Sequence, residues 1–399
     1  MEAVIDIAIL AVMVIMVRKN IHIGHVLFAC SVLFGITHQV PLTKLAALTL
    51  TSASSGSALN LFGSLYLITL LERISRHSGS QSRLVTGVKN LSGNPRFALA
   101  ALPAFIGLLP SPGGARFSAP MVEEAAKGVD ISKEQAAAIN YYYRHIWEYF
   151  LPLYPSSLLA VEILQISLNS FVLLMVPYAI VTTIFGLLLL RNIRPIPKET
   201  NPHPRSEAWK QVLEGVAPIC TIMFLVLVFN VHILAALSLV NVAMFIYYKI
   251  GWKAVWPMLK ASLEIRLLYI VFGALYLRDV MVISGSIEQL PGFFTSIGMT
   301  PLMITIVFPF SIGLLTGVSI PGITISLPLI IAMTGPDNLL SMASLGLLSN
   351  ILGLLLSPIH LCFIMSVEHF SANFAKTYVK LLLPGALILI FAVFYSFII

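Results

Sequence analysis

The sequence has little charge, and this decides the class of protein. Only 10% of its 399 residues are charged, whereas 58% are hydrophobic and the mean hydropathy is +0.93. Soluble domains carry about a quarter charged residues, so a soluble protein is excluded. No polar stretch is long enough to form a separate soluble domain. The chain is therefore an integral membrane protein, and its net charge of +7 reports orientation in the bilayer rather than binding to nucleic acid.

Motifs for catalysis and for metal binding are also missing. The chain contains no Walker loop, no HExxH pair, no GxSxG nucleophile elbow and no aspartate-rich phosphate-metal motif. Its three cysteines, Cys30, Cys220 and Cys362, are scattered through apolar segments, so they predict neither a metal-ligand cluster nor a disulfide framework. We therefore expect neither an enzyme nor an ATP-driven pump, and no metal or cofactor beyond a coupling ion.

What the chain does contain is long apolar runs, which predict an all-α polytopic membrane protein with about ten transmembrane spans. Two further segments, near 96–128 and 301–333, are interrupted by glycine and proline and predict re-entrant hairpins, in which the chain enters the membrane and returns on the same side. The expected spans lie near residues 3–17, 22–39, 42–71, 134–160, 168–190, 210–229, 232–248, 261–283, 338–366 and 380–398.

The basic residues predict the orientation of these spans. Of the 24 lysines and arginines, 19 fall in connections on one side, and only Lys44 falls on the other. Because cytoplasmic loops carry an excess of basic residues, the rich side is assigned to the cytoplasm. Arg18 and Lys19 follow the first apolar run, whereas a cleavable signal peptide has its positive charge in front. We therefore expect a retained first helix, with both termini outside.

The chain also repeats itself. Three pairs of segments match in the same order: "FGSLYL" from Phe62 with "FGALYL" from Phe272, "PAFIGLLPSPGGARFSAP" from Pro103 with "PFSIGLLTGVSIPGITISLP" from Pro309, and "FLPLYPS" from Phe150 with "LSPIHLC" from Leu356. A half that crosses the membrane five times inverts the half that follows. The sequence thus predicts two inverted repeats, 1–195 and 209–399, joined by a cytoplasmic linker at 196–208.

Inverted repeats with broken helices are the architecture of secondary transporters. Broken ends direct free backbone groups at whatever fills a cavity, and helix N-termini bind anions. Arg116 provides a positive charge for such an anion. The alternative is that these breaks only allow helices to pack closely. The substrate-binding candidates in the two hairpins are Ser111, Gly113, Gly114, Arg116 and Ser118, and Thr316, Ser319 and Gly322.

A second set of polar residues lies beside the helix breaks. Arg144, His145 and Glu148 precede the break near Leu151–Ser156, and His360 lies in the matching break of the second half. Ionisable residues inside a membrane are functional candidates. We assign Arg144 to the substrate anion, and His145, Glu148 and His360 to proton or ion coupling. The alternatives are an ion pair between Arg144 and Glu148, four residues apart on one helix, and a histidine that is merely buried.

Three of these motifs carry a resemblance. "LPSPGGARFSAPMVEEAA", "NYYYRHIWEYFLPLYPSS" and "SPIHLC" resemble the prokaryotic membrane family designated domain of unknown function 401, over nearly the whole chain. That family resembles the ion transporter superfamily, which includes gluconate permeases and sodium-coupled dicarboxylate and citrate carriers. The resemblance implies five spans and one hairpin per repeat, elevator-type anion transport and a prokaryotic cell membrane. By analogy it implies a homodimer.

The resemblance does not extend to the ligand signature of the dicarboxylate carriers. Those proteins carry Ser-Asn-Thr at each hairpin tip, whereas this chain has Ser111-Pro112-Gly113 and Ser319-Ile320-Pro321. We therefore expect a secondary active transporter for a small organic anion, a carboxylate, coupled to H+ or Na+. The alternatives are a channel or non-transporting receptor on the same fold, and a membrane-embedded enzyme. Saturable, gradient-coupled uptake would exclude a channel or a receptor. An enzyme would need a nucleophile–base pair or a metal site.

Overall fold

The structure is a computed structural model, and it describes residues 2–19, 21–91, 94–110, 114–127, 129–195 and 205–399. The helices of the first half are α1 (Glu2–Arg18), α2 (Ile23–Thr37), α3 (Leu42–Ser54), α4 (Gly56–His77), α5 (Ser80–Leu91), α6 (Pro95–Gly107), α7 (Ala115–Ala126), α8 (Lys133–Arg144), α9 (Pro155–Leu164) and α10 (Leu168–Gly186), with the 3-10 helix η1 (Leu187–Leu190).

The second half is built in the same way. Its helices are α11 (Arg205–Leu227), α12 (Ile233–Tyr247), α13 (Trp252–Ala261), α14 (Ile265–Ile283), α15 (Ser286–Ser296), α16 (Pro301–Thr316), α17 (Ser319–Met333), α18 (Leu339–Leu355), α19 (Leu361–His369) and α20 (Phe374–Ser396), with the 3-10 helix η2 (Pro336–Asn338). Two strands of two residues each, β1 (Val129–Asp130) and β2 (Arg194–Pro195), pair antiparallel beside the linker.

The structure confirms an all-α polytopic membrane fold. Within the described ranges, four helices are long and apolar enough to cross a membrane, or up to six if each of two bent helix pairs is one span. Large apolar side chains such as Leu173, Ile180 and Phe394 are exposed on these helices, which suits contact with lipid. The remaining expected spans are shorter or broken helices, so a total of ten stays a prediction.

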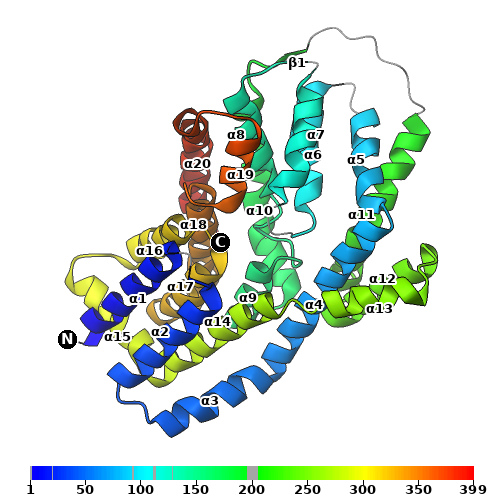
Figure 1. The fold of residues 1–399 in the computed structure, drawn as a ribbon. Coiled ribbons are helices and arrows are strands. Elements are labelled where there is room, and N and C mark those ends of the chain that lie inside the picture. The colour runs from blue at the N-terminus through cyan, green and yellow to red at the C-terminus, as the bar shows by residue number, and fades with distance from the viewer. Residues whose placement is uncertain (1, 20, 92–93, 111–113, 128, 196–204) are drawn as a thin grey trace.

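The helices form a central group with a flank on either side (Figure 1). α8, α10, α18 and α20 stand side by side in the centre, and α6 and α7 stand beside them. α5 packs along α11, and α4 crosses α12, on one flank. α1, α2, α14 and α15 lie together on the other. The polar residues at the two helix breaks, Arg144, His145, Glu148 and His360, lie at or just after the ends of α8 and α18 in this central group.

Corresponding helices pack alike in the two halves. α6 contacts α7 and α8, and α16 contacts α17 and α18. Gly107 of α6 lies against the carbonyl oxygen of Arg144, and Gly313 of α16 lies against that of Asn350, so neither position has room for a β-carbon. The number of residues from Gly107 to Gly313 equals the number from Arg144 to Asn350, so the two contacts correspond in the two halves. The inverted orientation of the repeats, and their limits at 195 and 209, stay predictions.

Several expected boundaries differ from the structure. The single span expected at 42–71 is two helices bent by 50°. Ser55 causes the break, because its extended backbone ends α3 while its hydroxyl accepts a hydrogen bond from the N–H of Ala58 and caps α4. α11 begins at Arg205, within the stretch expected to be linker, and residues 196–204 lie outside the described part of the chain.

α5, α13 and α15 occupy stretches expected to connect spans. α5 shows why. Its basic residues suggest a cytoplasmic loop, but the segment is an amphipathic helix. Leu84 and Val88 are buried beside α11, and Arg83 bonds Glu214 of α11 through Nε at 2.9 Å, while Lys89 is exposed. The helix that α5 packs against and the carboxylate that pairs with Arg83 are both distant in sequence. The charge pattern of the segment alone therefore suggests a loop.

Candidate functional site

The two helix breaks define the centre of the molecule. α8 ends at Arg144 and α9 begins only at Pro155, so the first break is longer than the sequence indicates. α18 ends at Leu355 and α19 begins at Leu361, in agreement with the expected break at Ser357–Pro358. Irregular backbone at membrane depth requires internal partners, and carbonyls at the second break find one in α8 of the other half.

α8 supplies those partners to α18 and α19. The Tyr141 hydroxyl lies 3.2 Å from the carbonyl oxygen of Leu354 and 2.9 Å from that of Leu355, which are two of the carbonyls that the end of α18 leaves free. The Asn140 amide donates to the Ser366 hydroxyl of α19 at 2.9 Å. All these groups are buried, so α8 and the second break are joined by a polar contact inside an apolar core.

The tip of the second hairpin also contacts this centre. Gly317 ends α16 in the left-handed conformation, with φ +65°, and its N–H donates to the Gly313 carbonyl. His360 Nδ1 donates to the Gly317 carbonyl at 2.7 Å, and the Ser357 hydroxyl donates to the Leu314 carbonyl at 2.7 Å. The second break therefore holds the turn between α16 and α17 in place.

The start of α17 receives side chains from both halves. Asn350 of α18 donates its amide to the Ser319 carbonyl at 2.9 Å, and Gly322 leaves room for that same side chain. The Ser319 hydroxyl donates to Glu148 Oε1 at 3.3 Å. Ser319 is the first residue of α17, where the helix dipole is positive. A buried carboxylate thus lies at a helix N-terminus between the two breaks.

The two histidines meet beside it. His145 Nε2 and His360 Nε2 are 3.1 Å apart, and His145 Nδ1 donates to the Tyr141 carbonyl at 2.6 Å. Cys362 joins them, so that one ligand-type atom from each of the three residues lies within 4.8 Å of the others. The sequence predicts no metal-ligand cluster that includes a cysteine, and this stays a prediction, although the fold groups Cys362 with the two histidines. The folded chain brings it to His145, 217 positions away in the sequence.

Comparison with known proteins places the chain. The family model described as "Protein of unknown function (DUF401)" matches residues 3–399. The chain belongs to this family. A search of curated proteins finds no match. Among solved structures, the Alcanivorax borkumensis YdaH transporter, whose crystal structure is described as having an unusual topology, has the same fold. Its TM-score is 0.61 at 13% identity, over 96% of this chain and 97% of that one.

In this member of the family, the first hairpin contributes less to the described site than expected. Arg116 is exposed on α7, and within the described ranges none of the ion pairs includes it. Ser118 is buried, and its hydroxyl donates to the Ala115 carbonyl of its own helix at 3.5 Å. Gly114 is buried at the start of α7, while Ser111 and Gly113 lie outside the described residues.

The second hairpin and the breaks carry the other candidates. Thr316 donates to the Ile312 carbonyl at 2.7 Å, so its hydroxyl stabilises the end of α16. Arg144 and Glu148 are buried, with 3% and 7% of their surface exposed. Their spacing of four residues suggested that they share a helix. They do not, because α8 ends at Arg144 and Glu148 lies in the following turn. That turn directs Glu148 to Ser319.

Sequence reasoning missed Asn140, Tyr141, Cys362 and Ser366. One signal for them was available: Tyr141 and His145 are four residues apart, a spacing that places both on one helix face. The pair His360-x-Cys362 was another, because two ligand-type residues flank a helix start just after a proline break. Asn140 and Ser366 give no comparable signal, since each gains meaning only from its partner.

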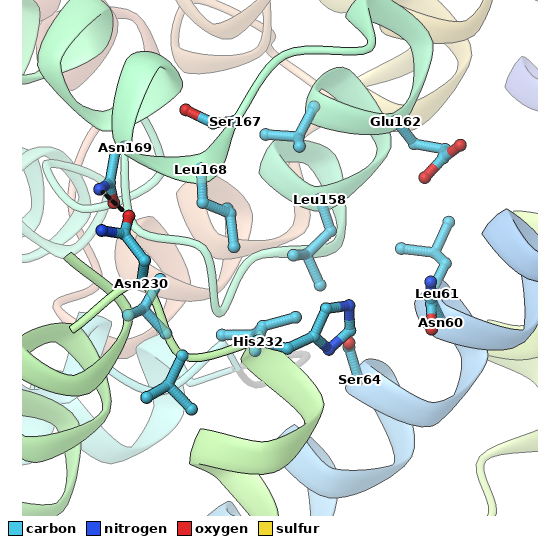
Figure 2. Close-up of a pocket in the computed structure, with 14 residues that line it drawn as sticks. Asn60, Leu61, Ser64, Leu158, Glu162, Ser167, Leu168, Asn169, Asn230 and His232 are labelled. Carbon is cyan, nitrogen blue, oxygen red and sulfur yellow. Dashed lines mark hydrogen bonds between the residues drawn. The ribbon is translucent and has the colours of Figure 1, made fainter.

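A separate pocket opens between the flank that contains α4 and α12 and the helices α9 and α10 (Figure 2). Its volume is about 250 Å³, and Asn169 bonds Asn230 across it at 2.8 Å. None of the predicted site residues that the structure describes lines it. Its polar lining comes from α4, α9, the start of α10 and the connection before α12: Asn60, Ser64, Glu162, Ser167, Asn169, Asn230 and His232.

Proposed function

We propose that this protein is a secondary active transporter for a small organic anion, a carboxylate, coupled to H+ or Na+. The observation that carries the proposal is the position of Glu148, whose carboxylate accepts the Ser319 hydroxyl at the start of α17. A helix N-terminus is an anion-binding position. Here an internal anion takes it. A solved structure of the same fold is described as a transporter, which supports this function.

Glu148 and a substrate carboxylate would compete for one position. Arg144 supplies a buried positive charge at the end of α8, and the Ser319 hydroxyl and the backbone near Gly322 and Thr316 complete the site. The charge that the sequence assigned to Arg116 is therefore assigned to Arg144, because Arg116 is exposed. The first hairpin, with Ser111, Gly113, Gly114 and Ser118, would approach the substrate from the other side.

Coupling of anion transport to a cation follows from the competition between Glu148 and the substrate carboxylate. A cation at Glu148, either H+ or Na+, neutralises the carboxylate and frees the start of α17 for the substrate. Cation and anion then bind together, as symport requires. Of the three coupling candidates, Glu148 takes the cation. His360 contacts the hairpin tip through the Gly317 carbonyl, and His145 contacts His360, so these two position the tip next to Glu148.

The proposal includes a place in the cell. The asymmetry of basic residues supports an orientation with both termini outside. The prokaryotic plasma membrane and membership of the ion transporter superfamily are what the family resemblance implies, and we include them in the proposal. By analogy with transporters of this design we also propose a homodimer, with no nucleic-acid partner and no cofactor in the transport step.

A thermal-shift screen of the purified protein in detergent tests the function. The panel contains mono-, di- and tricarboxylates, sugar acids and inorganic oxyanions, each with and without Na+ at two pH values. A ligand that binds the folded state raises its stability by mass action. We expect a carboxylate whose shift needs Na+ or low pH in the wild type. The shift should disappear in Arg144→Gln.

Glu148→Gln is the decisive variant, because a neutral amide imitates the cation-bound carboxylate. We expect its anion-induced shift to be independent of Na+ and pH. Glu162→Gln makes the same change in the separate pocket and should behave as the wild type. A shift in Glu148→Gln that keeps the wild-type cation dependence would contradict the assignment. Saturable, gradient-driven uptake into proteoliposomes would exclude a channel and a non-transporting receptor.

A further inference from the structure

The two imidazoles at the centre have a geometry that needs a cation. A carbonyl oxygen only accepts hydrogen bonds, so His145 Nδ1 at 2.6 Å from the Tyr141 carbonyl and His360 Nδ1 at 2.7 Å from the Gly317 carbonyl both carry the ring proton. In neutral rings the two Nε2 atoms are then lone-pair acceptors. They face each other at 3.1 Å, where two lone pairs repel unless a cation lies between them.

Cys362 supplies a third donor of the right kind. One ligand-type atom from each of His145, His360 and Cys362 lies within 4.8 Å of the others, so the sulfur would move closer to the two rings when an ion binds. Tetrahedral zinc has Zn–N of about 2.0–2.1 Å and Zn–S of about 2.3 Å, which separates two nitrogens by about 3.3 Å and a nitrogen and sulfur by about 3.6 Å. The observed 3.1 Å between the rings is close to the first value.

We propose that His145, His360 and Cys362 bind a transition-metal ion of the zinc type. Two imidazoles and a thiolate favour such an ion over Mg²⁺ and Ca²⁺, which prefer oxygen. The backbone carbonyls of Tyr141 and Gly317 fix both rings with Nε2 free, as carbonyls commonly do for metal-ligating histidines. Three protein ligands leave the fourth position for water or another group.

The surrounding charges permit this. Binding converts the Cys362 thiol to a thiolate, and its proton leaves to solvent. Arg144 is cationic and Glu148 is anionic, so the two residues nearest this group act on a bound cation in opposite directions. The ion would connect the break after α8 to the break before α19, and through His360 to the tip of the second hairpin. Metal binding would therefore stabilise this arrangement of the two halves, whatever the substrate is.

Cobalt titration of the purified full-length protein, freed of metal in detergent, tests the site. Co²⁺ bound to a thiolate gives a near-ultraviolet charge-transfer band, and tetrahedral Co²⁺ adds visible bands. The charge-transfer band identifies this site, because exposed histidines elsewhere can bind Co²⁺ without producing that band. We expect one equivalent of Co²⁺ per chain, displaced fully by Zn²⁺. His360→Gln removes a ligand and should weaken binding by at least about 100-fold, the upper range for loss of a residue that only orients a metal ligand.

Cys362→Ser should lose the charge-transfer band, while Cys220→Ser, which changes an exposed cysteine of α11, should keep it. If Cys362→Ser fails to fold, His360→Gln and a mass-spectrometric count of bound metal still decide the question. A wild-type protein that gives no thiolate–cobalt band, or a band that survives in Cys362→Ser, overturns the proposal. The rings would then share a proton instead. Neither result depends on transport activity.

Discussion

Replacing Gly313 by alanine should move the second hairpin off the helix that holds it. A β-carbon at Gly313 would overlap the carbonyl oxygen of Asn350 and lie 2.9 Å from the Leu354 nitrogen. Both atoms belong to the backbone of α18, so no rotamer change relieves the overlap. Overpacking costs about 1–3 kcal/mol, while alanine is favoured over glycine inside a helix by about 0.5–1 kcal/mol. We expect a net loss of stability of about 1–2 kcal/mol.

Gly292→Ala provides the matched control. Gly292 lies inside α15, and nothing lies within 4 Å of the position of its β-carbon, so only the helix preference remains. The two variants should differ by about 1–3 kcal/mol in unfolding free energy, which is the overpacking cost alone because the helix preference for alanine is common to both. Thermal unfolding in detergent, followed by intrinsic fluorescence at one scan rate, should place Gly313→Ala below the wild type and Gly292→Ala at or above it. Equal stability of the two variants would refute the close packing of α16 on α18.

Three further variants test the site. Tyr141→Phe removes the donor to two carbonyls at the end of α18 and should lower unfolding free energy by about 1–3 kcal/mol, and a change near zero in the same thermal assay would contradict that role. Asn350→Leu keeps the side-chain size but leaves the Ser319 carbonyl without its donor, so both stability and the anion-induced shift should fall. An unchanged anion-induced shift would argue against Ser319 in the site. Arg116→Gln should change anion affinity by no more than about twofold, as at most exposed positions, and a larger loss by thermal titration would return the anion to the first hairpin.

Much of the site was accessible from the sequence because the membrane limits what a polar residue can do. In an apolar chain, Arg144, His145, Glu148 and His360 are conspicuous, and the structure brings all four to the two helix breaks. Their partners were not accessible. The i, i+4 spacing predicted that Glu148 faces Arg144 on a helix, but the helix ends first, and the carboxylate contacts Ser319 in the other half.

Length and orientation of helices were predicted less well where two helices share one apolar run or where an amphipathic helix looks like a loop. The break at Ser55 depends on one side-chain cap, and α5 depends on α11 beside it. Neither changes the average hydropathy of its segment. Hydropathy reports transfer into lipid, and it does not report which face of a short helix contacts protein.

The sequence by itself determined that the protein lies in a membrane, that helices break near Leu151–Ser156 and near Ser357–Pro358, and which polar residues lie at those two breaks. Composition decides the first, since water and lipid sort residues by polarity wherever they stand, and proline and glycine decide the second by removing helical hydrogen bonds. Only the tertiary structure decided that Cys362 joins two histidines and that Glu148 lies at the start of α17. Hydrogen bonds act over about 3 Å, so such partnerships exist only after the two halves have packed.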